Sequence, residues 1–318
     1  MVRSEFTFLS ADGRTPIHAV DWAPETPPRG VLVLSHGVSE HILRYEPFAE
    51  FLTARGFAVA GHDHLGHGTS VAEGAPRLYF GGRGSWFQVA RDLYTRRELA
   101  GKRWPGVPVF LLGHSMGSFL ARTYLIRYPG TAAGAVLMGT GQMAPAAVAA
   151  GRLLAAEEAA RVGAQHASPL VSRLAFETYN RKFAPNRTAY DWLSASEENV
   201  DAYLADPLCG GEVTIGLFRE MLAGIAYITR RDNLRRMNLN TPVLFLSGRE
   251  DPVGDMGKGV RRAYESFRRA GVRDVELKLY PGLRHEILQE ACRETVYQEI
   301  LGWLAGRLRE IEKREERL

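Results

Sequence analysis

The sequence predicts an α/β fold with a mostly parallel central sheet, flanking helices and a helical cap inserted between two strands. Short apolar runs such as 31–34 and 135–138 alternate with segments of helical periodicity, and continuous apolar runs are typical of parallel strands buried on both faces. The stretch 142–240, which lies between two such runs, is far longer than one crossover helix requires. It therefore predicts an inserted helical unit.

The first elements are a hairpin and a buried strand. Residues 5–9 and 17–22 have strand patterns and flank the turn Ala11-Asp12-Gly13-Arg14, which predicts a hairpin at the edge of the sheet. The proline-rich segment 23–28 connects this hairpin to the apolar run 31–34. A run without polar residues is expected to lie inside the sheet.

Alternating helices and strands follow. A helix over about 45–55 is predicted from its apolar face and from Gly56, which is a stop signal. The strand 57–60 comes next, and a helix near 86–100 returns the chain to the apolar run 107–112. Strands separated by helices at this spacing favour a parallel sheet.

The second half of the chain contains the cap. We expect the cap over 142–236, which leaves 1–141 and 237–318 as the core. Within the cap, helical patterns cover 145–164, 168–183 and 213–229. The core then closes with alternating strands and helices at 242–246, 258–270, 275–280 and 293–312.

Composition and charge exclude several classes of protein. Two cysteines cannot form a disulfide framework, and the first ten residues lack the apolar core of a signal peptide, so we expect a cytoplasmic protein. Residues 132–151 carry no charge, but four glycines and a proline interrupt them, which argues against a membrane span. The net charge is +4, and the arginines are scattered. We therefore expect no nucleic-acid partner, no partner protein, and at most transient peripheral contact with a lipid surface.

The motif Gly113-His114-Ser115-Met116-Gly117 is where we expect the chemistry. It follows an apolar run and precedes the helix-like segment 118–126. A serine between two glycines at such a corner is typical of a nucleophile elbow. Side chains at positions 113 and 117 would collide with neighbouring elements in so tight a turn. The turn presents the Ser115 hydroxyl beyond the end of the sheet, as the candidate nucleophile.

Two further residues complete a candidate catalytic triad. A serine hydroxyl needs a base to take its proton and a carboxylate to hold that base in the right tautomer. His285 is the candidate base, because it follows the last predicted strand and is the only histidine after residue 166. Asp251 follows the strand before it and is the favoured acid, with Glu250 and Asp255 as rivals. The order serine, acid, histidine is that of hydrolases with a nucleophile elbow.

An oxyanion formed on attack needs two N–H donors. Met116, directly after the nucleophile, is the first candidate. The second is expected in the loop after the strand 31–34, where Val38 follows His36-Gly37.

Several motifs together resemble the monoacylglycerol lipase and lysophospholipase branch of the α/β-hydrolases, of the serine aminopeptidase S33 type. The resemblance implies the α/β-hydrolase fold and the hydrolysis of single-chain acyl esters such as monoacylglycerols through an acyl-enzyme. It also implies that no metal or organic cofactor is used. The motifs that carry it are His36-Gly37-Val38-Ser39-Glu40-His41, the segments 63–70 and 280–286, Asp206-Pro207-Leu208, and the elbow itself.

The resemblance also bears on binding of the headgroup. It implies that Glu40 and Arg44 lie near a glycerol headgroup, and the alternative is that they only tie their loop together. Mammalian-type members carry a second histidine three positions after the catalytic one, where this chain has Leu288. For the acyl chain, we expect an apolar channel in the cap, and four cap residues suggest it: Met143, Val148, Leu153 and Leu154.

Other functions remain as alternatives. A lysophospholipase, or a serine peptidase or amidase of the same fold, would use the same triad, and a non-catalytic binding module would keep the fold without turnover. Enzymes of this fold with an aspartate nucleophile are excluded by Ser115. The histidines at 62, 64 and 67 resemble a metal cluster, but Gly66 stands where a metallo-hydrolase pattern needs aspartate, so we predict no metal site there.

Overall fold

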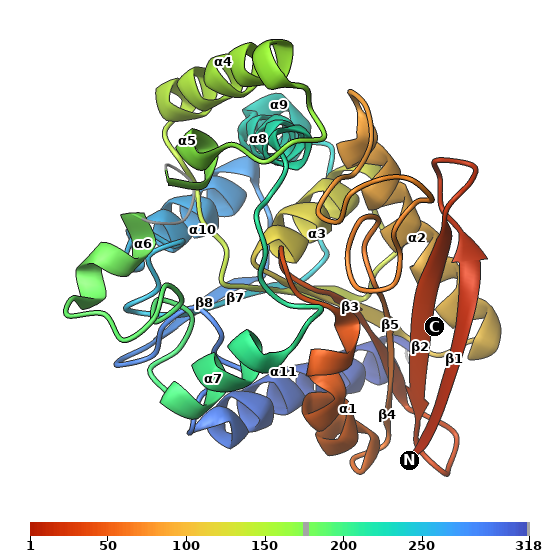
Figure 1. Cartoon of the computed structure of the whole chain (residues 1–318). Helices are drawn as coiled ribbons and strands as arrows, with labels where there is room; N and C mark the ends of the chain where they lie inside the picture. The colour runs from red at the N-terminus through yellow and green to blue at the C-terminus, as the bar shows by residue number, and fades with distance from the viewer. Residues whose placement is uncertain (174–177, 317–318) are drawn as a thin grey trace.

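A central sheet of eight strands organises the structure, a computed structural model that describes residues 1–173 and 178–316. The strand order is β1-β2-β4-β3-β5-β6-β7-β8 (Figure 1). The first two strands pair antiparallel, β2 is antiparallel to β4, and all later pairs are parallel. The strand bounds are β1 Val2–Leu9, β2 Pro16–Ala23, β3 Gly30–Ser35, β4 Phe57–His62, β5 Val109–His114, β6 Gly134–Met138, β7 Val243–Gly248 and β8 Val275–Tyr280. This arrangement confirms the predicted α/β fold with a hairpin at its edge.

Helices cover both faces of the sheet. Because alternate side chains of a strand point to opposite faces, Leu111 of β5 joins one hydrophobic core, while Phe110 and Leu112 join the other. The first core lies under α2 (Ser85–Arg103), α3 (Met116–Arg127) and α10 (Lys258–Ala270). The second lies under α1 (Glu46–Thr53) and α11 (Arg293–Glu315) (Figure 1).

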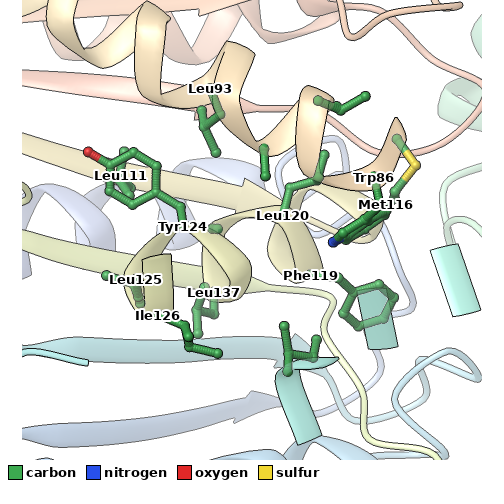
Figure 2. Packing of buried hydrophobic residues seen from close by; sticks show 14 of the residues in the cluster. Trp86, Leu93, Leu111, Met116, Phe119, Leu120, Tyr124, Leu125, Ile126 and Leu137 are labelled. Atoms are coloured by element: carbon green, nitrogen blue, oxygen red, sulfur yellow. The ribbon is translucent and has the colours of Figure 1, made fainter. Parts of the chain in front are cut away.

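The core beneath α2 and α3 fixes the start of α3, where the candidate nucleophile lies. Leu93 and Trp86 of α2, Met116 and Leu120 of α3 and Leu111 of the sheet all belong to this core (Figure 2). The indole N–H of Trp86 donates to the Thr123 hydroxyl at 3.0 Å. A buried indole needs such a partner, because an unpaired N–H is costly in an apolar core.

Among the described residues, six α-helices lie between β6 and β7 in the chain. Their bounds are α4 Pro145–Val162, α5 Pro169–Ser172, α6 Thr178–Asn180, α7 Glu197–Ala205, α8 Ile215–Thr229 and α9 Arg231–Leu234. A Cβ at Gly224 of α8 would lie 2.1 Å from the Trp86 ring, so this glycine lets the cap approach α2 closely. Helix α4 lies above α8, on the outside of the molecule (Figure 1).

The cap agrees only in part with the predicted helices. The helices expected at 145–164 and 213–229 are present as α4 and α8. The single helix expected over 168–183 is wrong, because the chain there forms the short α5, α6 and a 3-10 turn at Arg181–Phe183, with 174–177 outside the described residues.

The uncharged stretch 132–151 is divided between β6 and the first part of α4. Within the described parts of the chain, no helix combines the length and the apolar character that a membrane span requires.

Candidate active site

Ser115 stands between the end of β5 and the first residue of α3, in a strained conformation. Its φ is 52° and its ψ is −122°, a combination that residues with a side chain rarely adopt. The Ser115 N–H donates to the Met138 carbonyl at 2.9 Å. A Cβ at Gly113 would lie 2.3 Å from the Gly117 carbonyl oxygen, and one at Gly117 would lie 2.0 Å from the Ser35 carbonyl oxygen. The structure thus confirms that both positions require glycine.

Asp251 and His285 meet at the carboxyl ends of β7 and β8. The distance between His285 Nδ1 and Asp251 Oδ2 is 3.0 Å, and both side chains are buried. Asp251 also accepts hydrogen bonds from the Ser247 hydroxyl at 3.1 Å and from the Val253 N–H at 2.9 Å. A carboxylate held in this way keeps the proton on Nδ1 of the imidazole, which leaves Nε2 as the basic nitrogen.

The environment of Asp251 favours its charged form. Burial alone would raise its pKa, but His285 and three hydrogen bonds together hold the pKa below its usual value. The rival acid Asp255 instead pairs with Arg262 at 3.1 Å on the surface. Of the three predicted acids, Asp251 is the one that the structure brings to His285.

Two cavities meet at Ser115. We call the first the polar cavity; it has a volume of about 250 Å³, and His114, Ser115 and His285 line it with Glu40, Glu212 and Glu286. We call the second the apolar cavity, with a volume of about 110 Å³. Ser115, Val38 and Trp192 line both cavities. The other apolar side chains along the second are Met116, Phe119, Met143, Tyr179, Phe218, Met221, Leu222, Ile225 and Val253.

The cap supplies much of the wall of the apolar cavity, as expected, but mostly through other residues than those suggested by the sequence. Of the four suggested residues, Met143 lines it, whereas Val148 packs in the core, Leu153 is 72% exposed and Leu154 does not line it. Three of the four belong to α4, which lies outside α8, and side chains of α8 form the wall instead. The alanine-rich sequence of α4 did not reveal which of its faces turns inward.

The two predicted N–H donors belong to different elements. Met116 is the first residue of α3, and the N–H groups of a first helical turn have no acceptor within the helix. Val38 belongs to a loop that Ser39 turns with a φ of 59° and that Glu40 closes by accepting the Gly37 N–H at 2.5 Å. Both residues line a cavity at Ser115, as an oxyanion site requires.

A network of buried charges lies behind the polar cavity. The Arg44 guanidinium donates to Glu40 at 2.7 Å and to both carboxylate oxygens of Glu286, at 2.7 and 2.8 Å. Glu40 also accepts from the Tyr45 hydroxyl and pairs with His114 Nδ1 at 3.0 Å. Burial opposes these charges, but the Arg44 guanidinium and the contact with His114 hold the pKa of Glu40 well below its usual value. Arg44 likewise lowers the pKa of Glu286 against the effect of burial.

Two roles were considered for Glu40 and Arg44: binding of the headgroup, or stabilisation of their own loop. The contacts of this network favour the second. Glu40 reaches the wall of the polar cavity, but its carboxylate oxygens are engaged within the loop. Arg44 points to the two carboxylates and stacks 5.0 Å from the Tyr203 ring. Both are therefore placed to fix the shape of the loop that carries Val38.

Replacement of Arg44 by methionine is expected to destabilise the protein by about 3–5 kcal/mol, because it leaves two buried carboxylates without their cation. Chemical denaturation of wild type and variant measures this loss. The matched control is Arg262→Met, which removes a half-exposed pair with Asp255 and is expected to cost less than about 1 kcal/mol. Equal losses in the two variants would contradict the role assigned to Arg44.

Residues from the cap that sequence analysis did not identify complete the site. Trp192 lies with its ring 5.2 Å from that of His285. Tyr190 and Tyr203 line the polar cavity with it. The signals available in the sequence were weak, because aromatic residues in an insertion are as often core residues as ligand contacts.

Hydrogen bonds fasten this part of the cap to the loop of His285. The Glu286 N–H donates to the Leu193 carbonyl at 2.8 Å, and Glu290 accepts the N–H groups of Ala195 and Ser196. Arg284 donates to the carbonyl oxygens of residues 191 and 194. These hydrogen bonds tie the segment that carries Trp192 to the loop that carries His285.

His62, His64 and His67 are the three histidines at which the sequence predicts no metal site. All three are fully buried, and the two ring nitrogens of His62 have no partner among the described residues. Among the described residues, a different group brings three possible metal ligands together. It consists of His41, Asp206 and Cys209, whose ligand atoms all lie within 4.8 Å of one another. His41 Nε2 and Asp206 Oδ2 are 2.7 Å apart there, as in an ordinary hydrogen bond.

Comparison with known proteins finds relatives over almost the whole chain. The family model for serine aminopeptidase, S33, matches residues 26–291. A monoacylglycerol lipase from Mycolicibacterium smegmatis is 30% identical over 96% of this chain and 98% of its own. Monoglyceride lipase from Homo sapiens is 32% identical over 94% of this chain and 89% of its own.

Solved structures give the same result. A highly thermostable carboxyl esterase from Bacillus coagulans, in complex with glycerol, superposes with a TM-score of 0.90 and 26% identity over 97% of this chain and 99% of its own. The fold of almost the whole chain thus occurs in a known carboxyl esterase. The chain belongs to the serine aminopeptidase S33 family of α/β-hydrolases, in the branch that includes the monoacylglycerol lipases.

Proposed function

We propose that this carboxylic-ester hydrolase acts on single-chain acyl esters such as monoacylglycerols, with Ser115 as nucleophile, His285 as base and Asp251 as the acid that orients it. The observation that carries the proposal is the position of Ser115 at the junction of a polar and an apolar cavity. An ester with one acyl chain has one apolar part and one polar part, joined at the carbon that Ser115 would attack. The relatives described as monoacylglycerol lipases support the same substrate class.

The reaction proceeds in two halves. The Ser115 hydroxyl loses its proton to Nε2 of His285 and attacks the ester carbonyl, and the N–H groups of Val38 and Met116 receive the developing oxyanion. The imidazolium then gives its proton to the departing alcohol, which leaves an acyl-enzyme. Water, activated by the same imidazole, releases the carboxylic acid and restores Ser115.

In this assignment the acyl chain occupies the apolar cavity and the alcohol occupies the polar cavity. The side chains of α8 enclose the chain, and burial of each methylene contributes about 0.8 kcal/mol. The polar cavity offers the Glu212 carboxylate and the Ser172 hydroxyl group to the alcohol. Glu40 and Arg44 act here as positioning residues for the loop of Val38.

A substrate panel tests this function. Purified wild type is given monoacylglycerols, a lysophospholipid, short nitrophenyl esters and aminoacyl amides, and release of the acid is measured. We expect turnover of the monoacylglycerols and the nitrophenyl esters, and none of the amides. Turnover of amides without esters would move the protein to the peptidase alternative. Failure to hydrolyse any of these substrates would favour a binding module.

A further inference from the structure

Acidic side chains outnumber basic ones in the wall of the polar cavity. Three carboxylates, those of Glu40, Glu212 and Glu286, lie along its wall. Among the residues that the structure describes, no lysine or arginine lines it, and the one cationic counterpart in the wall is His114, which pairs with Glu40. A cavity with low-dielectric walls and a net negative charge favours a ligand of the opposite sign.

The three carboxylates are not equivalent. Glu40 and Glu286 share the guanidinium of Arg44 behind the wall, and His114 bonds to Glu40, so their charges are largely compensated. Asn199 also donates to Glu286 at 2.8 Å. Glu212 is different, because it is exposed and has neither an ion pair nor a hydrogen bond with any residue in the described ranges. It therefore places an uncompensated negative charge at the mouth of the cavity.

Aromatic rings make up much of the remaining wall. Trp192 and Tyr203 line the cavity beside Tyr190, whose ring lies 5.2 Å from that of Tyr203. The faces of such rings attract cations, and quaternary ammonium groups above all. A carboxylate at the mouth and aromatic faces inside thus favour the same kind of group.

We propose that the polar cavity selects ester leaving groups that carry a positive charge, such as amino alcohols and quaternary ammonium alcohols, and disfavours anionic ones, with Glu212 as the specificity-determining residue. This inference rests on the proposed function. The chemistry is unchanged: the alcohol leaves with the proton that His285 delivers, and water completes the hydrolysis of the acyl-enzyme to the free acid.

Three hexanoyl esters of matched shape test the proposal. Their alcohols are choline, its neutral carbon isostere 3,3-dimethylbutan-1-ol, and the anionic isethionate. For wild type at low salt we expect kcat/KM to decrease in that order, with steps of about 3- to 5-fold, the effect of one partly screened charge several ångströms away. In Glu212→Gln, the ratio of the choline ester to the neutral ester should fall by about the same 3- to 5-fold. Added salt should reduce the ratio in wild type more than in the variant.

The control is Glu198→Gln on the exposed face of α7, which lines neither cavity and should leave all three values unchanged. A choline ester no faster than its neutral isostere in wild type, or a ratio unaffected by Glu212→Gln, would overturn this inference alone. Failure of wild type to hydrolyse the neutral ester as well would overturn the proposed function too.

Discussion

Replacement of Ser115 by alanine is expected to reduce turnover of a good ester substrate by about 10⁶-fold, which is the loss typical of removing a triad nucleophile. The hydroxyl is the atom that forms the acyl-enzyme, and alanine offers no substitute. The fold should be retained, because the Ser115 hydroxyl has no hydrogen bond with any residue that the structure describes, and Gly113 and Gly117 allow the close backbone contacts of the elbow. Steady-state hydrolysis of a nitrophenyl ester measures the loss of turnover, and circular dichroism checks that the fold is retained.

A double variant makes this test more specific. If Ser115 and His285 act as one unit, Ser115→Ala with His285→Ala should be no slower than Ser115→Ala alone, since triad losses are not additive. The matched control is Ser85→Ala, which removes another buried serine hydroxyl, in α2, far from the triad in sequence. Residual turnover in Ser115→Ala within about tenfold of wild type would rule out this nucleophile.

Stability is expected to fall steeply as the pH decreases from about 6.5 toward 5, the interval that begins at the ordinary pKa of histidine. The fully buried histidines at 36, 62, 64 and 67 cause this. Burial lowers the pKa of all four, that of His67 to about 3. In the unfolded chain they take up protons below pH 6.5, whereas in the folded protein His62, His64 and His67 remain neutral over this interval, and His36 takes up its proton only at lower pH than in the unfolded chain.

The sign and size of this effect follow from proton linkage. Because the unfolded state binds more protons, the free energy of unfolding falls as the pH falls, by about 1.4 kcal/mol per pH unit for each histidine. The three histidines with the largest shifts, His62, His64 and His67, give an uptake of about three protons near pH 5. Asp92 acts in the opposite direction, because burial raises its pKa to about 6 and the folded state takes up its proton within this window, which offsets about one proton. His18 and His114 have raised pKa values, so their contribution arises mainly above pH 6.5. Urea denaturation from pH 7.5 to 5 measures the slope.

A single substitution isolates one of these protons. In His62→Leu the slope should decrease by about one proton, because this histidine is neutral when folded and protonated when unfolded. Both of its ring nitrogens are buried without a described partner, so leucine leaves no polar group unsatisfied. The control, His166→Leu, changes an exposed histidine and should leave the slope as it is. If the free energy of unfolding did not change over this pH interval, the buried histidines would have to be solvated or already charged in the folded protein.

The core could be predicted from the sequence because each of its elements carries its own signal. The strand 275–280 and the helix 258–270 have the predicted bounds, and the strands at 31–34 and 57–60 are only slightly longer than expected. Full burial on both faces leaves these strands uniformly apolar. The triad could be proposed for a related reason, since Asp251 and His285 each follow such a strand and the sheet brings their ends together.

The cap and the charge network could not be predicted in this way. Helix α7 has a weakly apolar sequence, and its signal was local: Ser196 accepts the Asn199 N–H, with acidic residues in the first turn. The polar cavity depends on contacts between the cap and the core, such as that between Trp192 and His285. Periodicity does not encode contacts of this kind, because they arise only when distant segments meet.

Identification of the acylated residue is the most direct test of the claim that Ser115, His285 and Asp251 form one catalytic unit. The enzyme is mixed with a slowly deacylating ester, quenched in acid, digested and examined by mass spectrometry. One acyl group on the peptide that contains Ser115, absent when His285 is replaced by alanine, is the predicted result. An acyl group on another residue, or full hydrolysis with no acylated peptide under conditions that trap a control serine esterase, would contradict the account.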